Sequence, residues 1–108
     1  MADFNDRQKA FENKFARDDE LQFKVTARRN RLVGEWAAAK MGKSGDDIAA
    51  YAKEIVEVDF EEAGDEDVVR KLLADFEAAG TDVDDAAIRE ALEENMNEAR
   101  RQFVEENE

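Results

Sequence analysis

The sequence contains no cysteine, no proline and no histidine among its 108 residues. Without cysteine and histidine, the chain has no thiol nucleophile, no Ser-His-Asp triad and no ordinary structural zinc site. A disulfide is excluded as well, so cysteine usage says nothing about the redox compartment. The absence of proline permits long, uninterrupted helices. Several classes of catalytic and metal chemistry are therefore excluded before any motif is considered.

Long apolar runs are also missing. No apolar stretch approaches the roughly 20 residues needed to cross a bilayer, and the N-terminus is charged where a signal peptide would be apolar. Hydrophobic residues make up 43 % of the chain, but 18 residues are alanine. This composition suits a single helical domain, in which small alanine faces let helices approach, better than a sandwich or barrel. We expect a soluble, cytoplasmic protein without membrane insertion.

Charge is abundant and unevenly distributed, with a net value of −13. Residues 1–43 hold 10 Lys and Arg against 7 Asp and Glu, a net charge of +3, whereas residues 44–108 hold 6 against 22, a net charge of −16. An acidic chain is repelled by nucleic-acid phosphates and anionic lipids, so we expect neither as a partner. The basic excess of the first segment is local, and a solvated helix face is its simplest interpretation.

Apolar residues recur with the helical period of about 3.6 in four segments separated by glycine. Connections this short make consecutive helices pack antiparallel, so the sequence predicts an all-α four-helix bundle with a long first helix. The predicted limits are Asp6 to Met41 for the first helix, Ser44 as N-cap and Gly64 as end of the second, Asp65 as N-cap and Gly80 as end of the third, and Thr81 or Asp82 as N-cap of the fourth.

Each predicted helix has one apolar stripe that we expect to face the core. In chain order the stripes contain Leu21, Val25, Leu32 and Trp36; Ile48, Tyr51, Ala52, Ile55 and Val56; Val69, Leu72, Leu73 and Phe76; and Ile88, Leu92, Met96, Ala99 and Phe103.

The N-terminal segment carries a phenylalanine stripe together with four lysines and arginines. On a helix, Phe4, Phe11 and Phe15 fall within about 40° of one another. An acidic triplet then interrupts the stripe, and the second and third predicted helices are much shorter than the first. We therefore predict that residues 1–19 overhang a bundle of residues 20–108 as an amphipathic arm that binds a partner. The alternative is that the arm folds back onto the bundle.

Other patterns that resemble ligand sites are incomplete. Gly42-Lys43-Ser44 looks like the end of a phosphate-binding loop, but position 37 is alanine where the loop needs its first glycine. An EF-hand starting at Asp82 would need an oxygen ligand at 86 and glycine at 87, and both are alanine. The many carboxylates suit solvated helices rather than a catalytic pair. We expect no catalytic residue, no metal site and no cofactor, so the chain is predicted not to be an enzyme.

The densest basic patch is the run from Arg28 to Arg31, which is followed by Trp36. Arginines beside an aromatic ring can bind phosphate and stack on a base. They can equally pair with the acidic helices of the same bundle, and this second interpretation is the one we favour. A lysine near a helix N-terminus, as at Lys43 and Ser44, could also hold a phosphate weakly.

Several short runs, in a fixed order, resemble one family. They are Asp6-Arg7, Ala10-Phe11-Glu12, Lys14-Phe15, Ala27-Arg28-Arg29-Asn30, Gly34-x-Trp36-Ala37-Ala38, Ala50-Tyr51-Ala52-Lys53-Glu54 and the stretch from Asp59 to Val68. In that order they resemble the alphaproteobacterial zeta subunit, an inhibitor of the F1Fo ATP synthase. The resemblance runs from about residue 3 to the C-terminus and is looser in the fourth helix.

The resemblance implies a four-helix bundle that binds the F1 catalytic head, with its alpha, beta and gamma subunits, and blocks ATP hydrolysis. A helix lodged between two catalytic subunits would prevent the closure that rotation requires. Such a protein would be peripheral to the inner membrane when bound to F1, and we expect a monomer when it is free. On the arm, Phe4, Phe11 and Phe15 would be the apolar anchors, and Arg7, Lys9, Lys14 and Arg17 would reach acidic or carbonyl groups of the enzyme.

Members of the family are also thought to bind ADP or ATP weakly. The candidate residues for such a regulatory ligand are Arg28, Arg29, Lys43 and Ser44. Two alternatives remain open from the residues themselves: an acidic helical adaptor unrelated to ATP synthase, and a nucleotide sensor. Removal of residues 1–19 discriminates the inhibitor from the adaptor, because the inhibitor should then fail whereas an adaptor could use any face of the bundle.

Overall fold

The structure is a computed structural model that describes residues 19–58 and 64–106. Four helices lie in these ranges, namely α2 (Asp19–Lys40), α3 (Asp46–Val58), α4 (Glu66–Ala78) and α5 (Asp85–Glu106). Every regular element described is helical, which confirms the all-α four-helix fold. The part of the predicted first helix before Asp19 lies outside the described residues. None of the described helices is long and apolar enough to span a membrane.

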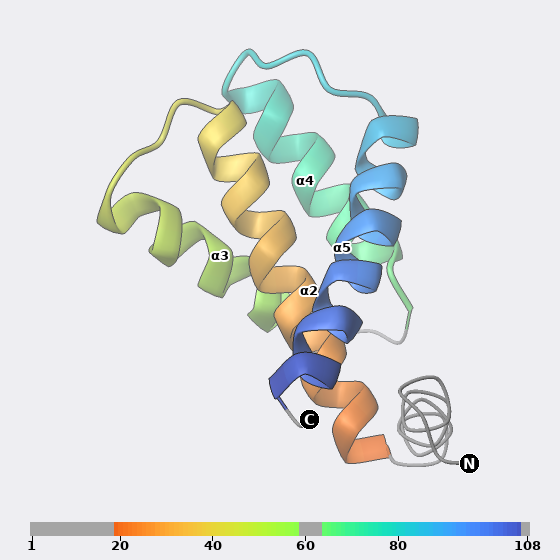
Figure 1. Cartoon of the computed structure of the whole chain (residues 1–108). Helices are drawn as coiled ribbons and strands as arrows, with labels where there is room; N and C mark the ends of the chain where they lie inside the picture. The colour runs from red at the N-terminus through yellow and green to blue at the C-terminus, as the bar shows by residue number, and fades with distance from the viewer. Residues whose placement is uncertain (1–18, 59–63, 107–108) are drawn as a thin grey trace, which may run out of the picture.

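Helix α2 lies at the centre of the bundle (Figure 1). It packs against α3 on one side and α5 on another, while α4 contacts both α3 and α5. A helix enclosed in this way needs apolar residues around much of its circumference. Val33 and Ala37 are completely buried although they lie about 100° from the predicted stripe residues Leu32 and Trp36. The single-stripe prediction for this helix was therefore too narrow.

The core consists of two clusters of apolar side chains. The principal cluster joins all four helices through Val33, Ala37, Ala38, Tyr51, Ile55, Val68, Val69, Leu72, Phe76, Ile88 and Leu92. The smaller cluster joins α2 to α5 through Val25 and Ala99, with Leu21, Leu32, Met96 and Phe103 packed against them. Most of the predicted stripe residues lie in these clusters.

The start of α3 corrects one predicted boundary. The helix begins at Asp46, so the residue directly before it is Gly45 and not the predicted cap Ser44. The Asp47 N–H donates to the backbone carbonyl of Ser44 at 3.2 Å. Gly45 has a φ of +59°, a left-handed conformation that glycine adopts readily. The turn from α2 to α3 therefore ends at Gly45, one residue later than the prediction from the capping preference of Ser44.

The start of α5 corrects a second boundary. The helix begins at Asp85, and its cap is Asp84, whose carboxylate accepts the Ala87 N–H at 2.8 Å. The predicted caps Thr81 and Asp82 lie in the preceding loop. Three residues of this loop, Thr81, Asp82 and Asp84, have side chains suited to capping. Which of them caps α5 is therefore decided by the span that the chain must cover between α4 and α5.

Gly34 is the point of closest approach between α2 and α3. A Cβ atom at this position would lie 2.6 Å from the Cα of Ala52 and 3.2 Å from Cγ1 of Ile55. Because the nearest atom belongs to backbone, no side-chain rotation could relieve the contact. Glycine on α2 and alanine on α3 together allow the two helices to pack this closely.

We expect Gly34→Val to destabilise the bundle, because the added side chain must push α3 away from α2. Overpacking of this kind typically costs about 1–3 kcal/mol. Thermal unfolding followed by circular dichroism measures the effect. Ala39→Val is the control, since it adds bulk at an exposed position of the same helix. Equal melting temperatures for the two variants would contradict the close helix contact.

We also expect a fragment of residues 20–108 to unfold cooperatively. Both clusters are built from residues between 21 and 104, and each large buried apolar side chain contributes about 1.5–3 kcal/mol. A thermal melt of the fragment tests this expectation. A fragment that shows no transition would mean that residues 1–19 are needed for folding.

Candidate functional site

The candidate F1-binding residues all precede the described part of the chain. They are Phe4, Arg7, Lys9, Phe11, Lys14, Phe15 and Arg17. The first turns of α2, to which this segment is joined, lie at the end of the bundle where α5 also ends (Figure 1). The assignment of these seven residues stays a prediction.

The structure does not bring the four candidate nucleotide-binding residues together. Arg28 and Arg29 lie in the middle of α2, whereas Lys43 and Ser44 lie in the loop that follows it. At 1.5 Å per residue, the helix between Arg29 and Lys40 alone spans about 17 Å. The two arginines and the loop residues therefore belong to separate surfaces.

Arg28 binds the last turns of α5. Its Nη1 donates to Oε1 of Glu106 at 2.5 Å and to Oε1 of Gln102 at 3.4 Å. The guanidinium carbon lies 4.3 Å from the centre of the Phe103 ring, so the cation covers an aromatic face. The favoured interpretation, in which the arginine patch pairs with acidic helices of the same chain, is confirmed at this residue.

Arg29 is buried, with an exposed fraction of 3 %. Its Nε and Nη2 donate to Oδ1 of Asn30 at 2.9 and 2.7 Å, and Nη2 also donates to Oδ1 of Asp65 at 2.9 Å. Asp65 occupies the N-cap position of α4, but its side chain makes no capping bond. The predicted N-cap position of Asp65 is therefore confirmed, but its carboxylate attaches the start of α4 to α2 and does not cap the helix.

Asn30 is a buried polar residue that the sequence analysis did not select. It is 1 % exposed, and its Oδ1 holds the guanidinium of Arg29. Its position three residues before Val33 places both side chains on the same face of α2, which could have indicated that Asn30 is buried. The single-stripe prediction did not include this face. Its Nδ2, like Oδ2 of the buried Asp67, has no hydrogen-bond partner among the described residues.

We expect Arg29→Ala to lower the free energy of unfolding by about 1–3 kcal/mol, because it leaves a buried amide oxygen and the Asp65 carboxylate without their donor. Urea unfolding measures this change. The control is Arg31→Ala, on the exposed side of the same helix, which should change stability by less than about 0.5 kcal/mol. If both variants unfold at the same urea concentration, the Arg29 contacts do not stabilise the bundle.

Two pockets lie on the described surface near these groups. One of about 390 Å³ opens beside Arg29 and is lined by Arg29, Asp65, Arg89, Leu92, Glu93, Met96, Asn97 and Arg100. The other, of about 330 Å³, lies where the end of α2 meets α3 and α4 and is lined by Met41, Lys43, Tyr51, Glu54, Lys71, Asp75, Ala78 and Ala79. Arg29 and Lys43 thus border different pockets, and Arg28 lines neither of them.

The pocket at Lys43 is organised around Tyr51. The Tyr51 hydroxyl donates to Oδ2 of Asp75 at 2.7 Å, and Nζ of Lys71 lies 3.0 Å from the same oxygen. The Nζ atoms of Lys43 and Lys71 lie 5.8 and 5.6 Å from the centre of the tyrosine ring. Burial and the hydrogen bond to Asp75 raise the pKa of Tyr51 above its ordinary value, so its hydroxyl stays protonated.

Arg89 borders the pocket beside Arg29 and connects two helix starts. It forms a two-pronged contact with Glu66 at 3.0 and 3.1 Å and bonds Asp85 at 2.6 Å. These hydrogen bonds hold the pKa of Glu66 below its ordinary value and raise the pKa of Arg89. Both groups therefore remain charged near neutral pH.

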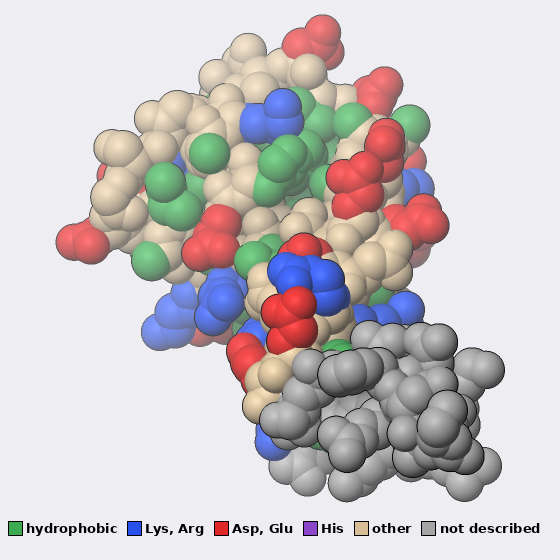
Figure 2. Space-filling model, in the orientation of Figure 1, with side chains coloured by type: hydrophobic (Ala, Val, Ile, Leu, Met, Phe, Trp, Pro, Cys, Tyr) green, Lys and Arg blue, Asp and Glu red, His purple; other side chains and the backbone are tan. Residues whose placement is uncertain are grey.

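The surface of the described region is predominantly acidic. Figure 2 shows Asp and Glu side chains over the first turns of α5 and at the start of α3, with hydrophobic side chains between α2 and α5. Within residues 19–58 and 64–106, no three His, Cys, Asp or Glu side chains are grouped to hold a metal ion. Each pocket instead combines basic side chains with two carboxylates, Asp65 and Glu93 in one and Glu54 and Asp75 in the other.

Comparison with known proteins covers nearly the whole chain. A family model described as ATPase inhibitor subunit zeta matches residues 1–102. A structure solved by solution NMR is 48 % identical, with a TM-score of 0.72, over 80 % of this chain and 98 % of that chain. No curated protein matches the chain. The family match includes the N-terminal segment and the described helices up to residue 102 of α5.

Proposed function

Because the chain belongs to the ATPase inhibitor subunit zeta family, we propose that it blocks ATP hydrolysis by the F1 catalytic head of ATP synthase. The match over residues 1–102 is the observation that carries this proposal. A family of inhibitor subunits is regulatory, so no catalytic chemistry is required of this chain. Inhibition needs only a segment that binds the head and a domain that presents it.

In this proposal residues 1–19 are the inhibitory element and the bundle is their support. A helix over this segment would place Phe4, Phe11 and Phe15 on one stripe, with Arg7, Lys9, Lys14 and Arg17 to meet acidic or carbonyl groups. Lodged among the alpha, beta and gamma subunits, it would hold two catalytic subunits apart and prevent the closure that rotation requires. The packing of α2 between α3 and α5 supports this role, because it gives the segment a rigid attachment.

We expect Phe11→Ala and Phe15→Ala to relieve inhibition without unfolding the bundle. Anchors buried at an interface supply most of its binding free energy. Loss of a buried phenylalanine typically costs about 3–5 kcal/mol, and half of this weakens binding more than tenfold. The half-inhibitory concentration of each variant should therefore rise at least tenfold in an ATPase assay with the cognate F1.

Leu72→Ala is the matched control for folding. Leu72 is fully buried in the principal cluster, so its truncation should lower the melting temperature while the remaining folded protein still inhibits. The arm proposal fails if Phe11→Ala unfolds the domain, or if the double phenylalanine variant inhibits as well as the wild type. A wild-type chain that leaves ATP hydrolysis unchanged would favour an acidic adaptor instead.

We further propose that ADP or ATP binds weakly as a regulatory ligand, at the pocket of Lys43. Arg28 and Arg29 are poor candidates because their guanidinium groups already bond protein oxygens. Lys43 forms no ion pair with a described residue, and it lies with Lys71 beside the Tyr51 ring. A phosphate could meet the ammonium group of Lys43, whereas that of Lys71 is already paired with Asp75 at 3.0 Å. The overall charge of −13 also opposes tight binding of a polyanion.

Titration of the full chain with ADP, followed by NMR, tests this site. We expect millimolar ligand to shift the amide signals of Lys43, Ser44, Tyr51 and Lys71, and Lys43→Gln to abolish these shifts. Lys53→Gln, an exposed lysine on the outer part of α3, is the matched control. Shifts confined to α5, or none at millimolar ADP, would remove the nucleotide proposal and leave the inhibitory one intact.

A further inference from the structure

Arg100 differs from the arginines that surround it on α5. Arg89 and Arg101 each bond two carboxylates. Arg100 is exposed and makes no hydrogen bond or ion pair with a described residue. In a chain with 29 acidic and 16 basic residues, an arginine without a carboxylate partner is unexpected. Arg31 shares this property, but it does not border either pocket.

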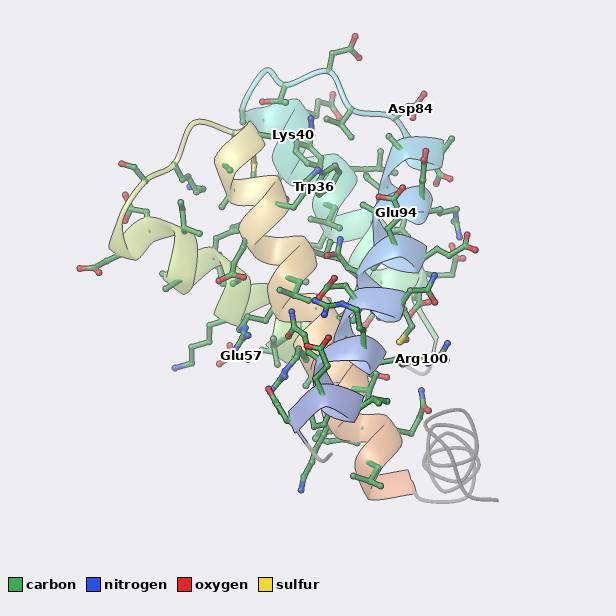
Figure 3. The ribbon with its side chains drawn as sticks, in the orientation of Figure 1. Trp36, Lys40, Glu57, Asp84, Glu94 and Arg100 are labelled. Carbon is green, nitrogen blue, oxygen red and sulfur yellow. The ribbon has the colours of Figure 1, made fainter. Side chains whose placement is uncertain are left out.

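Arg100 stands at one end of the pocket beside Arg29. The residues that α5 contributes are spaced at i, i+3, i+4, i+7, i+8 and i+11, so they form one continuous helix face. The opposite wall is formed by Arg29 of α2 and Asp65 before α4. Figure 3 shows Arg100 on the side of the bundle away from Glu57 of α3. We call this pocket, with a volume of about 390 Å³, the α5 groove.

The α5 groove is less acidic than residues 44–108 as a whole, which carry a net charge of −16. Two of its arginines, Arg89 and Arg100, balance the carboxylates of Asp65 and Glu93, and Arg29 of α2 adds a third guanidinium. Arg29 and Arg89 already bond carboxylates, so Arg100 supplies the donors that remain. Arginine binds a carboxylate through two parallel hydrogen bonds, which gives geometric specificity as well as affinity.

The other lining residues indicate a peptide rather than a polyanion. Met96, one helical turn before Arg100, is half-buried and offers an apolar surface next to it, and the buried Leu92 lies one turn further along the groove. A polyphosphate entering the groove would also meet Asp65 and Glu93, whereas a single carboxylate could approach Arg100 alone. The groove therefore fits an Asp or Glu side chain with an apolar neighbour on the same segment.

We propose that the α5 groove is a second contact with the F1 head, which receives such an acidic and apolar segment of the enzyme. This inference rests on the proposed inhibitory function and adds a contact on the bundle to that of the arm. Two linked contacts strengthen binding, because the first raises the effective concentration of the second. The family match extends through residue 102 and so includes the whole groove.

The test compares Arg100→Glu with Arg31→Glu in the full chain. Both variants exchange an exposed, unpaired arginine for glutamate, so they change the net charge equally. In an ATPase assay with F1, Arg100→Glu should raise the half-inhibitory concentration at least tenfold, and Arg31→Glu less than twofold. Asn97→Glu, which adds a carboxylate to the groove without removing Arg100, should also weaken inhibition. Thermal melts should show all three variants folded.

The outcomes separate this inference from the function on which it rests. A wild-type chain that does not inhibit overturns the proposed function. If the wild type inhibits but Arg100→Glu behaves like Arg31→Glu, only the groove contact is overturned. If Arg100→Glu instead changes the sedimentation of the free protein, a second copy of this chain occupies the groove and the F1 contact is wrong.

Discussion

The architecture depends on the enclosure of α2 by α3 and α5. Gly34 and Ala52 let α3 approach so closely that a Cβ on Gly34 would lie 2.6 Å from the neighbouring backbone. On another side, Val25 packs with Ala99 of α5. Because α4 contacts α3 and α5, its position depends on both of these contacts. A change in the spacing of α2 would therefore move every other helix and both pockets.

Charge is organised by a few arginines that join helices distant in sequence. Arg28 connects α2 to the end of α5, Arg29 connects α2 to the start of α4, and Arg89 connects the starts of α4 and α5. Exposed pairs of this kind contribute little stability individually. The Arg29 contacts differ, because removal of Arg29 would leave the buried oxygen of Asn30 without a donor, and removal of Asp65 would leave a buried guanidinium without its carboxylate. Because these arginines already bond carboxylates of the same chain, they are less available to bind a partner than an arginine without such bonds.

The bundle and the N-terminal segment have different physical requirements in the proposed inhibitor. The bundle needs a core that holds α2 in place, and its two apolar clusters form this core because both include residues of α2. In the proposal, the phenylalanines of the segment are the apolar anchors, and its four lysines and arginines meet acidic or carbonyl groups of the enzyme. A groove on α5 that also contacts the enzyme would orient the bundle as the segment binds. The division explains how one small domain could inhibit a large enzyme without any chemistry.

The sequence by itself determined the helical class, the glycine breaks, most of the core and the resemblance to an inhibitor family. These features are local, since the spacing of residues such as Leu72 and Phe76, or a glycine at 80, acts within one helix or turn. Tertiary structure decided which capping residue begins α5, and it used Asp65 to bind Arg29 rather than to cap α4. It also separated Arg29 from Lys43 and placed Arg100 in a groove. Such outcomes depend on the distances between helices, and the spacing of apolar residues within one helix does not determine these distances.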